Sequence, residues 1–529
     1  MAKRLNWETL LSTKRVSEFG YCGPKKEGIA SQFEDPRSQY ERDFDQLVYS
    51  YPFRRLQDKT QVIPFPKYDF VHNRLTHSIE VASVGRSLGK LAAEIIFKEL
   101  DPKFIQENRL CRNDIGALVG AACLAHDIGN PPFGHSGEEA ISYYFTDLQM
   151  RSFEPNYHLI FEWAPDYVKS ENGGLVLDNC GEEICLDKVH VFADTKKWTD
   201  LTSFEGNANG FKIVTCNCAK GINPSAALIG TFTKYPRESW LTTEINGEKS
   251  KDKSQSKYGF FQEQRDLFQE IAKELGLIRI EGIDPYEIAY KRHPLAFLME
   301  AADDIANCII DFEDGCRLGL IDFEKGYTFE GYADSISPKD ILCGIAKIDK
   351  SYKPHVVEEA ENTNQAITYL RSKIINILTH YAFNIFKENY EDIMSGKFDH
   401  ALVDCFEDKE LNANLSLMKK LVVNNVYHYT PVLETEASGF EVMGALIDAF
   451  ASSCNICHSC GDKESSKTKK LKELLPLEYR SEHEATEGEL SFDDKYQRVM
   501  KIIDYVSGMT DNYASSLYRR IKGITLPRS

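Results

Sequence analysis

One stretch constrains the fold of this chain more than any other: an apolar helix that must end beside an adjacent histidine and aspartate. Apolar side chains recur along it at the three- and four-residue spacing of one helix face, at Ile115, Leu118, Val119 and Ala122. The same face reaches His126, and Asn113 offers a good helix start. The helix must stop before Pro131 and Pro132, because proline cannot continue a helix. The sequence therefore predicts a buried helix whose C-terminal end presents His126 and Asp127.

Two further segments show helical periodicity. In residues 74–98 the apolar face is formed by His77, Val81, Val84, Leu88, Leu91 and Ile95. In residues 294–313 an apolar stripe is formed by Leu295, Leu298, Ala302, Ile305, Ile309 and Phe312. Beside that stripe Asp303, Asn307 and Asp311 recur four residues apart and therefore share one polar face. A buried carboxylate at Asp303 needs a partner, and a metal ion is one, whereas a solvated helix face is the alternative.

The composition is that of a globular protein with a sizeable core. The chain has 529 residues, of which 42% are hydrophobic and 27% charged. We predict an all-α, mostly helical fold with an irregular insertion at about 165–260, where helical periodicity fades and short β-like runs predict hairpins and loops. Residues 1–340, including the insertion, are expected to form the core, and residues 341–529 a helical C-terminal region that packs on it. A single last helix is expected at about 493–521.

Charge and hydropathy exclude several classes of protein. The net charge of −18 argues against a protein that coats nucleic acid over its whole surface. The longest apolar run, Ala117–Ala125, is too short to span a bilayer, and the N-terminal segment lacks the apolar stretch of a signal peptide. We therefore expect a cytoplasmic protein that does not bind membranes, with most of its 14 cysteines reduced.

The His126-Asp127 pair points to metal chemistry. An imidazole nitrogen and a carboxylate oxygen together suit a divalent cation such as Mn, Fe, Co or Mg. The free carbonyl groups at a helix end add a partial negative charge that also favours a cation. Taken alone, the pair has a plainer explanation, a capping aspartate beside a hydrogen-bonded core histidine, and His77 could likewise be a core histidine.

These residues carry a resemblance to the HD-domain metal phosphohydrolases, in which a histidine on one helix, a His-Asp pair on the next and a distant aspartate on a third hold a metal. Within that group the chain resembles the deoxyguanosine triphosphate triphosphohydrolase (dGTPase) family. The most specific match is the run HDIGNPPFGHSGE at residues 126–138. Shorter matches follow in family order over nearly the whole chain, at Arg54–Leu56, Gln61–Val62, Arg74–Ser78, Glu205–Ala208, Glu300–Asp304 and Asp504–Asp511.

The resemblance implies an HD-type catalytic core, a divalent metal and hydrolysis of dGTP, and of other dNTPs, to a deoxynucleoside and inorganic triphosphate. It implies metal ligands at His77, His126, Asp127 and Asp303, with Mn or Mg first and Fe or Co as alternatives. It implies that His135 is the catalytic acid/base near the α-phosphate. Glu138, one helical turn later, would orient His135, because a carboxylate fixes the tautomer of an imidazole and raises its basicity.

The resemblance also implies a substrate-binding set. Gln61 and Val62 would contact the base and sugar, and Arg74 belongs to the same set. Asn207, Lys234 and Lys257 would hold the triphosphate, because lysines act as point charges for phosphate, although unpaired surface lysines are the plainer reading. Asp311 would bind the 3′-hydroxyl of the sugar.

The chain departs from the family pattern at Asn307. Relatives commonly carry tyrosine at this position, four residues after the metal aspartate, and its ring packs on the deoxyribose. A shorter amide leaves a larger pocket, so the sequence predicts weaker exclusion of a 2′-hydroxyl. We expect dGTP to remain the best substrate and GTP or other dNTPs to be hydrolysed measurably.

A second cluster, Cys454, Cys457 and Cys460 with His458 between them, has spacing that suits zinc or an iron–sulfur cluster. No fourth ligand is evident, and buried or free thiols are the alternative.

Partners beyond the substrate follow from the resemblance alone. Relatives form homo-oligomers, often hexamers, and some bind single-stranded DNA as an effector. The basic cluster around Arg519, Arg520 and Lys522 could serve that purpose, as could the lysines of residues 467–472, although both have the pattern of solvated faces.

Two other functions remain compatible with parts of the pattern. One is an HD phosphohydrolase that acts on another nucleotide, and the other is a nucleotide-sensing regulator without turnover. The complete set of metal-type and acid/base residues argues against the regulator.

Overall fold

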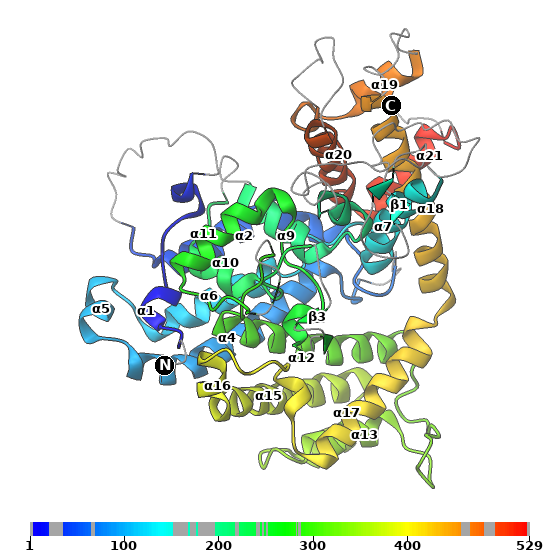
Figure 1. The fold of residues 1–529 in the computed structure, drawn as a ribbon. Coiled ribbons are helices and arrows are strands. Elements are labelled where there is room, and N and C mark those ends of the chain that lie inside the picture. Colours follow the sequence, from blue (N-terminus) through cyan, green and yellow to red (C-terminus); the bar gives the residue numbers. More distant parts are fainter. Residues whose placement is uncertain are drawn as a thin grey trace.

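The computed structural model describes residues 4–20, 35–64, 69–151, 196–216, 222–239, 252–281, 283, 287–455, 466–480 and 492–525, together with strand residues 168–169, 176–177, 244–245 and 248–249. Helices make up nearly all of the regular structure in this part of the chain, which confirms the predicted all-α class (Figure 1). The described strands form two antiparallel pairs of two residues each, β1 (Val168–Lys169) with β2 (Val176–Leu177) and β3 (Glu244–Ile245) with β4 (Glu248–Lys249).

Among the described residues up to 320, the helices are α1 (Trp7–Leu10), α2 (Gln39–Tyr49), α3 (Tyr51–Arg55), α4 (Arg74–Glu99), α5 (Pro102–Glu107), α6 (Arg112–Ala125), α7 (Gly134–Arg151), α9 (Gly206–Cys216), α10 (Ala226–Phe232), α11 (Arg265–Glu274) and α12 (Pro294–Arg317). The later helices are α13 (Pro338–Ala346), α14 (Pro354–Glu358), α15 (Thr363–Glu388), α16 (Tyr390–Met394), α17 (Lys409–Val422), α18 (Thr430–Asn455), α19 (Ser466–Leu474), α20 (Phe492–Ser507) and α21 (Asp511–Ile521). Short 3₁₀ turns lie at Val16–Phe19, Leu56–Asp58, Lys253–Gln255, Gln262–Gln264, Val403–Cys405 and Leu477–Tyr479, and a π-helical turn lies at Val423–Tyr427.

The predicted helices at 74–98, near 113–125 and at 294–313 are confirmed as α4, α6 and α12. Helix α6 begins slightly earlier than predicted, at Arg112. The Asp114 side chain accepts a 2.7 Å hydrogen bond from the backbone N–H of Cys111, the residue that caps the helix. Acidic residues in a first turn stabilise the free N–H groups and the positive end of the helix dipole.

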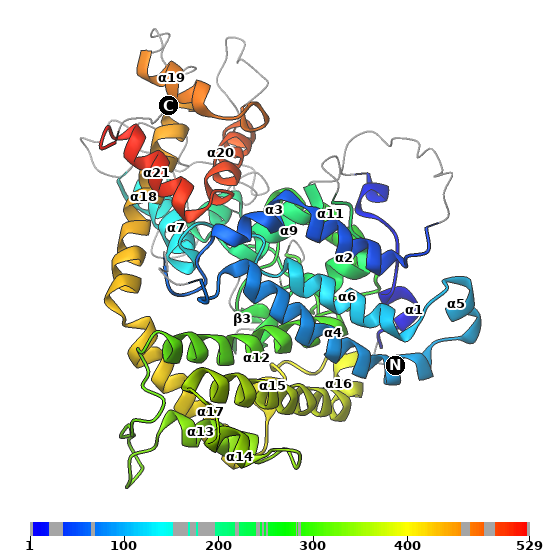
Figure 2. The same cartoon turned by 180° about the vertical axis from the view of Figure 1, so that it is seen from behind.

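Close packing of α4 on α6 brings the first histidine towards the His-Asp pair. A methyl group on Gly89 of α4 would lie 2.7 Å from the backbone oxygen of Ile115 in α6, and one on Gly85 would overlap the sulfur of Cys123. Glycine at these two positions therefore lets the two helix backbones approach closely. Helix α12 packs against both, as Figure 2 shows from behind, so three helices from distant parts of the sequence converge.

Two apolar clusters lie on either side of the loop that leaves α6. The larger is built from α4, α6, α10, α11, α12 and α15, and the smaller from α7, α18, α20 and α21. Helix α18 runs along one side of the molecule from α17 to the group formed by α19, α20 and α21 (Figures 1 and 2). The C-terminal helices therefore contribute directly to packing around α7, the helix that begins beside the His-Asp pair.

Two sequence predictions are corrected. Residues 165–260 contain two short antiparallel strand pairs, but α9 and α10 are helical. Both helices are buried because their apolar and small residues pack into the core. The predicted last helix at 493–521 is two helices, since Gly508, Met509 and Thr510 separate α20 from α21 and Thr510 caps the second. The division at residue 340 stays a prediction. No helix in the described part of the chain is both long and apolar enough to cross a bilayer.

Candidate active site

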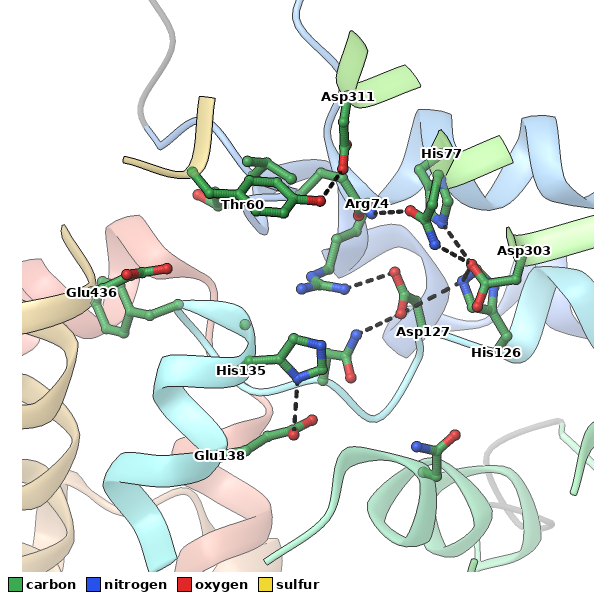
Figure 3. Close-up of a pocket in the computed structure, with 18 of the residues that line it drawn as sticks. Thr60, Arg74, His77, His126, Asp127, His135, Glu138, Asp303, Asp311 and Glu436 are labelled. Atoms are coloured by element: carbon green, nitrogen blue, oxygen red, sulfur yellow. Dashed lines mark hydrogen bonds and ion pairs between the residues drawn. The ribbon is translucent and has the colours of Figure 1, made fainter. Parts of the chain in front are cut away.

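Four acidic and imidazole side chains meet where α4, α6 and α12 converge. His77 lies in the first turn of α4, and His126 and Asp127 follow the last turn of α6. One ligand-type atom from each of these three residues lies within 4.8 Å of the others. Oδ1 of Asp303 on α12 lies 3.4 Å from Nε2 of His77 and 3.4 Å from Nε2 of His126, and Figure 3 shows the four side chains turned towards one another.

The donor atoms of this cluster fit a divalent cation. Both ring nitrogens of His77 and Nε2 of His126 are buried without a hydrogen-bond partner, which is costly unless another ligand satisfies them. Nδ1 of His126 lies 2.7 Å from the carbonyl oxygen of Cys123 and can donate to it, which leaves the lone pair of Nε2 facing the cluster. Two imidazole nitrogens and two carboxylates in one buried place are a ligand set typical of a divalent transition metal or Mg.

The electrostatic environment keeps both aspartates ionised. Burial raises the pKa of the Asp127 carboxyl, but the charge of Arg74, with the charges of His126 and His77 when these are protonated, outweighs it and holds that pKa at about 2. Nη1 of Arg74 donates a 2.7 Å hydrogen bond to Asp127. The pKa of Asp303 is also well below its usual range, because the two histidines and Lys234 outweigh its burial. The cluster thus offers two negative charges to a cation at neutral pH.

A histidine and a carboxylate lie on the other side of the turn that follows Asp127. The backbone takes left-handed dihedral angles at Phe133 (φ 65°) and Gly134 (φ 60°), and α7 begins there. His135 is thereby presented on the first turn of α7 with its side chain 77% exposed, and its Nδ1 lies 3.2 Å from Oε2 of the buried Glu138. This contact with Glu138 raises the pKa of His135, although partial desolvation of the ring opposes it. Side chains at Gly206 would overlap the Glu138 carboxylate, so glycine there makes room for it.

All of the candidate site residues line one cavity of about 690 Å³. The members named from the sequence are Gln61, Val62, Arg74, His77, His126, Asp127, His135, Glu138, Asn207, Lys234, Lys257, Asp303, Asn307 and Asp311. A cavity of this size suits a nucleotide-sized ligand, and its walls carry cationic groups, carboxylates and apolar side chains together.

Comparison with known proteins agrees with this arrangement. Residues 74–159 match the HD domain family, and residues 406–520 match the phosphohydrolase-associated domain. A deoxyguanosinetriphosphate triphosphohydrolase-like protein of Synechocystis sp. is 35% identical over 99% of this chain and 100% of its own length. The chain belongs to the dGTP triphosphohydrolase-like family of HD-domain proteins.

Other relatives of this family match over similar lengths. A deoxyguanosinetriphosphate triphosphohydrolase-like protein of Listeria innocua is 30% identical over 98% of this chain and 100% of its own. A deoxyguanosinetriphosphate triphosphohydrolase of Cronobacter sakazakii is 30% identical over 94% of this chain and 96% of its own. An HD domain implies a divalent metal, and His77, His126 and Asp127 form a cluster that could hold one.

The basic groups of this cavity are paired with carboxylates in the structure. Nζ of Lys234 lies 3.7 Å from both Glu300 and Asp303. Burial lowers the pKa of Lys234, but Tyr235 and these two carboxylates outweigh it and raise that pKa. Nζ of Lys257 lies 3.2 Å from Oε1 of Glu205, which also accepts a 2.7 Å hydrogen bond from Asn207. The sequence did not single out Glu205 by role, although it lies in a matched segment.

Asn307 lies in the cavity wall with both ends of its amide engaged. It donates a 2.7 Å hydrogen bond to Oδ1 of Asp303 and accepts one of 3.2 Å from Nε2 of Gln61. The prediction that Asn307 simply enlarges the pocket is therefore incomplete, because the amide also ties two other site residues together.

Two cavity residues of this family member escaped the sequence reasoning. Tyr427, in the π-helical turn before α18, donates a 2.6 Å hydrogen bond to Oδ2 of Asp311. Nothing in the local sequence marks Tyr427, because its partner is 116 residues away. Asn130 donates a 2.5 Å hydrogen bond to Oδ1 of Asp127 and could have been noticed within the HDIGN run. The predicted cysteine cluster stays untested, since Cys457 and Cys460 lie outside the described residues.

Proposed function

We propose that this protein hydrolyses dGTP, and other dNTPs less efficiently, to a deoxynucleoside and inorganic triphosphate, with a divalent cation held by His77, His126, Asp127 and Asp303. The observation that carries the proposal is one cavity that combines a cation-type ligand set, a His-Glu pair and basic groups. The dGTPase-like relatives support the same chemistry over the full length of the chain. Mn or Mg is the expected metal, since both accept imidazole or carboxylate ligands and bind phosphates.

In this proposal the basic residues of the cavity receive the triphosphate. Arg74, Lys234 and Lys257 provide charge-assisted hydrogen bonds to phosphate oxygens. Lys257 leaves its 3.2 Å contact with Glu205 to do so, because a polyphosphate carries more charge than one carboxylate. Gln61 and Val62 face the base and sugar, and Asp311 accepts the 3′-hydroxyl.

Hydrolysis then needs attack at the α-phosphorus and loss of the nucleoside. A divalent cation supplies Lewis-acid polarisation of a phosphoryl oxygen. Water adds to the α-phosphorus, the bond from phosphorus to the 5′-oxygen breaks, and inorganic triphosphate forms. His135 donates a proton to the departing 5′-oxygen, since the contact with Glu138 favours its protonated form. Arg74 stays bonded to Asp127 and keeps that carboxylate oriented.

The test is incubation of the protein with each dNTP and with GTP, in Mn and in Mg, in water enriched in ¹⁸O. We expect deoxyguanosine and inorganic triphosphate from dGTP, with the label in triphosphate alone. Label in the nucleoside would show attack at carbon. Release of pyrophosphate or orthophosphate would favour a different nucleotide phosphohydrolase, and binding without any product would favour a regulator.

Assembly and location belong to the same proposal. We propose a cytoplasmic homo-oligomer, a hexamer by family resemblance, with single-stranded DNA as an effector. Light scattering after size-exclusion chromatography measures the oligomeric state. The rate of dGTP hydrolysis with and without a single-stranded oligonucleotide tests the DNA effector. A monomer would contradict the proposed homo-oligomer, and a rate that DNA leaves unchanged would contradict the proposed effector.

A further inference from the structure

One buried carboxylate from the C-terminal region joins two segments of the active site. Asp511 begins α21 and is 2% exposed. Its Oδ1 accepts a 3.1 Å hydrogen bond from the backbone N–H of Phe133, and its Oδ2 accepts one of 2.9 Å from the backbone N–H of Thr60. Both oxygens of one side chain are therefore used to fix two loops relative to each other.

Each of these loops carries a group that the proposed reaction needs. Phe133 stands two residues before His135, and Thr60 stands immediately before Gln61. Phe133 has a φ of 65°, a left-handed conformation that residues other than glycine adopt at an energetic cost. The hydrogen bond to Asp511 fixes the backbone N–H of this strained residue. Because α7 begins at the next residue, Gly134, the same bond helps to set the direction in which α7 starts.

A second contact holds the middle of the same loop. Nζ of the buried Lys59 donates to the carbonyl oxygen of Asn130 and, at 3.0 Å, to that of Ser507. Asn130 in turn bonds Asp127. The chain from Ser507 to Asp511, which includes the break between α20 and α21, is therefore joined to the turn between Asp127 and His135 at two points. One contact is direct, through Asp511, and the other runs through Lys59.

A third contact, from Asn209, fixes the start of the loop at Gly129. Nδ2 of Asn209 on α9 donates a 2.6 Å hydrogen bond to the carbonyl oxygen of Gly129 and lies 3.3 Å from Oγ of Ser507. Three backbone groups of the loop are therefore satisfied by side chains rather than by a helix or strand ladder. These are the carbonyl oxygens of Gly129 and Asn130 and the N–H of Phe133, which bond Asn209, Lys59 and Asp511 in turn.

A buried carboxylate that satisfies two N–H groups could serve stability alone. Two facts favour a functional role. Neither Asp511 nor Lys59 lines the substrate cavity, so neither can touch the ligand directly. Both partners of Asp511 are backbone groups of cavity residues, because Thr60 and Phe133 line the cavity themselves. A change at Asp511 would therefore move cavity groups without removing any of them.

We propose that Asp511 is a positioning residue for the reaction: it sets the distance between His135 and the segment that holds the base and sugar. This inference rests on the proposed function and extends it to the C-terminal helical region, which thereby completes the geometry of the catalytic loop. An error of about 1 Å in the position of a catalytic group can cost about 100-fold in rate.

The first test is a double-mutant cycle on dGTP hydrolysis. Asp511→Asn keeps one acceptor but places an N–H₂ group against a backbone donor, so kcat should fall about 10- to 100-fold while bound metal is unchanged. The same substitution in a His135→Ala background should lower kcat much less, because there is no longer an imidazole to misplace. Asp511→Glu, which retains the carboxylate, should recover part of the rate. Equal losses in both backgrounds would overturn the proposal.

The second test does not depend on catalysis. Hydrogen exchange at the Thr60 and Phe133 amides should accelerate in Asp511→Asn, and unchanged exchange would overturn the proposal whatever the activity. Absence of triphosphate release by the unaltered protein would instead refute the proposed function alone.

Asp200→Asn is the matched control for both measurements. Asp200 is also fully buried and accepts from the backbone N–H of Gln262 at 2.9 Å and from the hydroxyl of Tyr496 at 2.5 Å, but these donors lie outside the cavity wall. The variant Asp200→Asn should lower the melting temperature while leaving kcat and the exchange of the Thr60 and Phe133 amides unchanged. A loss of kcat equal to that of Asp511→Asn would reduce the role of Asp511 to stability.

Discussion

The hydroxyl of Tyr427 donates a 2.6 Å hydrogen bond to the carboxylate of Asp311, and so joins the turn before α18 to helix α12 at the wall of the cavity. Burial raises the pKa of Asp311 to about 6, and the hydrogen bond from Tyr427 acts in the opposite direction. The pair places a phenol ring and a carboxylate side by side in the cavity wall, where the proposed function puts the sugar.

Tyr427→Phe should therefore weaken substrate binding without affecting the metal. The ring remains, but Asp311 loses a donor, and a lost hydrogen bond to a carboxylate is worth about 1.5 kcal/mol or more. We expect KM for dGTP to rise roughly tenfold and bound metal to be unchanged. Tyr429→Phe, at a tyrosine outside the cavity wall, is the control. A KM that stays constant in Tyr427→Phe would separate this pair from sugar binding.

Asn307→Tyr tests the predicted effect of the amide on sugar selectivity. A larger ring should raise the ratio of kcat/KM for dGTP over GTP, since exclusion of a 2′-hydroxyl by crowding becomes stronger. The same change removes the hydrogen bonds to Asp303 and Gln61, so kcat/KM should fall for both substrates. The measurement is kcat/KM for dGTP and for GTP, in the unaltered protein and in Asn307→Tyr. An unchanged ratio, or no GTP hydrolysis by the unaltered protein, would show that another wall sets the choice.

Removal of a metal ligand should remove metal and activity together. In His126→Ala or Asp127→Ala only three of the four ligands remain, and metal content measured by elemental analysis should fall with the rate of dGTP hydrolysis. His72→Gln is the control, because His72 is a partly buried histidine in the segment before α4 that pairs with Asp314 instead of the cluster. Full occupancy and full activity in both ligand variants would exclude this cluster as the metal centre.

His135 and Glu138 should together set the alkaline limb of the pH dependence of kcat. His135→Ala should lower kcat by about 10²- to 10⁴-fold and leave the metal bound. As a proton donor His135 must be protonated, and its raised pKa extends activity to higher pH. Glu138→Gln removes the contact that raises this pKa, so the alkaline limb of the kcat profile should move to lower pH. Glu139→Gln, at the exposed neighbour, should leave the limb in place, and a limb that Glu138→Gln does not move would contradict the pairing.

His72 should make stability depend on pH. Burial lowers its pKa, but hydrogen bonds to Asp314 and Glu80 outweigh it and raise the pKa to about 9. A histidine whose pKa is raised on folding contributes stability that is complete below its unfolded pKa of about 6.5 and is lost as pH rises through 9. His72→Gln should therefore lower the free energy of unfolding by about 3 kcal/mol at pH 6 and by much less at pH 9.5. Urea denaturation at the two pH values measures this, and equal losses at both would show that the pair is not ionic.

Local sequence rules accounted for the three helices of the site. Apolar spacing over 74–98 and 294–313, and the stop at Pro131-Pro132, depend only on neighbouring residues, and α4, α6 and α12 formed where they predicted. The same rules failed in residues 206–232, where α9 and α10 are so buried that their apolar and small residues show no amphipathic face. They also predicted one helix in place of α20 and α21, since the break that begins at Gly508 is only three residues long.

The sequence by itself determined which residue types could hold a cation and move a proton, because His126, Asp127, His135 and Glu138 lie within one turn and helix start. Only the tertiary structure decided what holds them in position. Phe133 meets Asp511 across 378 residues, Thr60 meets Asp511 across 451, and Asp311 meets Tyr427 across 116. No periodicity relates residues at such separations. Their contacts arise from the packing of α18, α20 and α21 with α7 and of the π-helical turn Val423–Tyr427 with α12. That packing depends on the summed burial of many side chains rather than on any one of them.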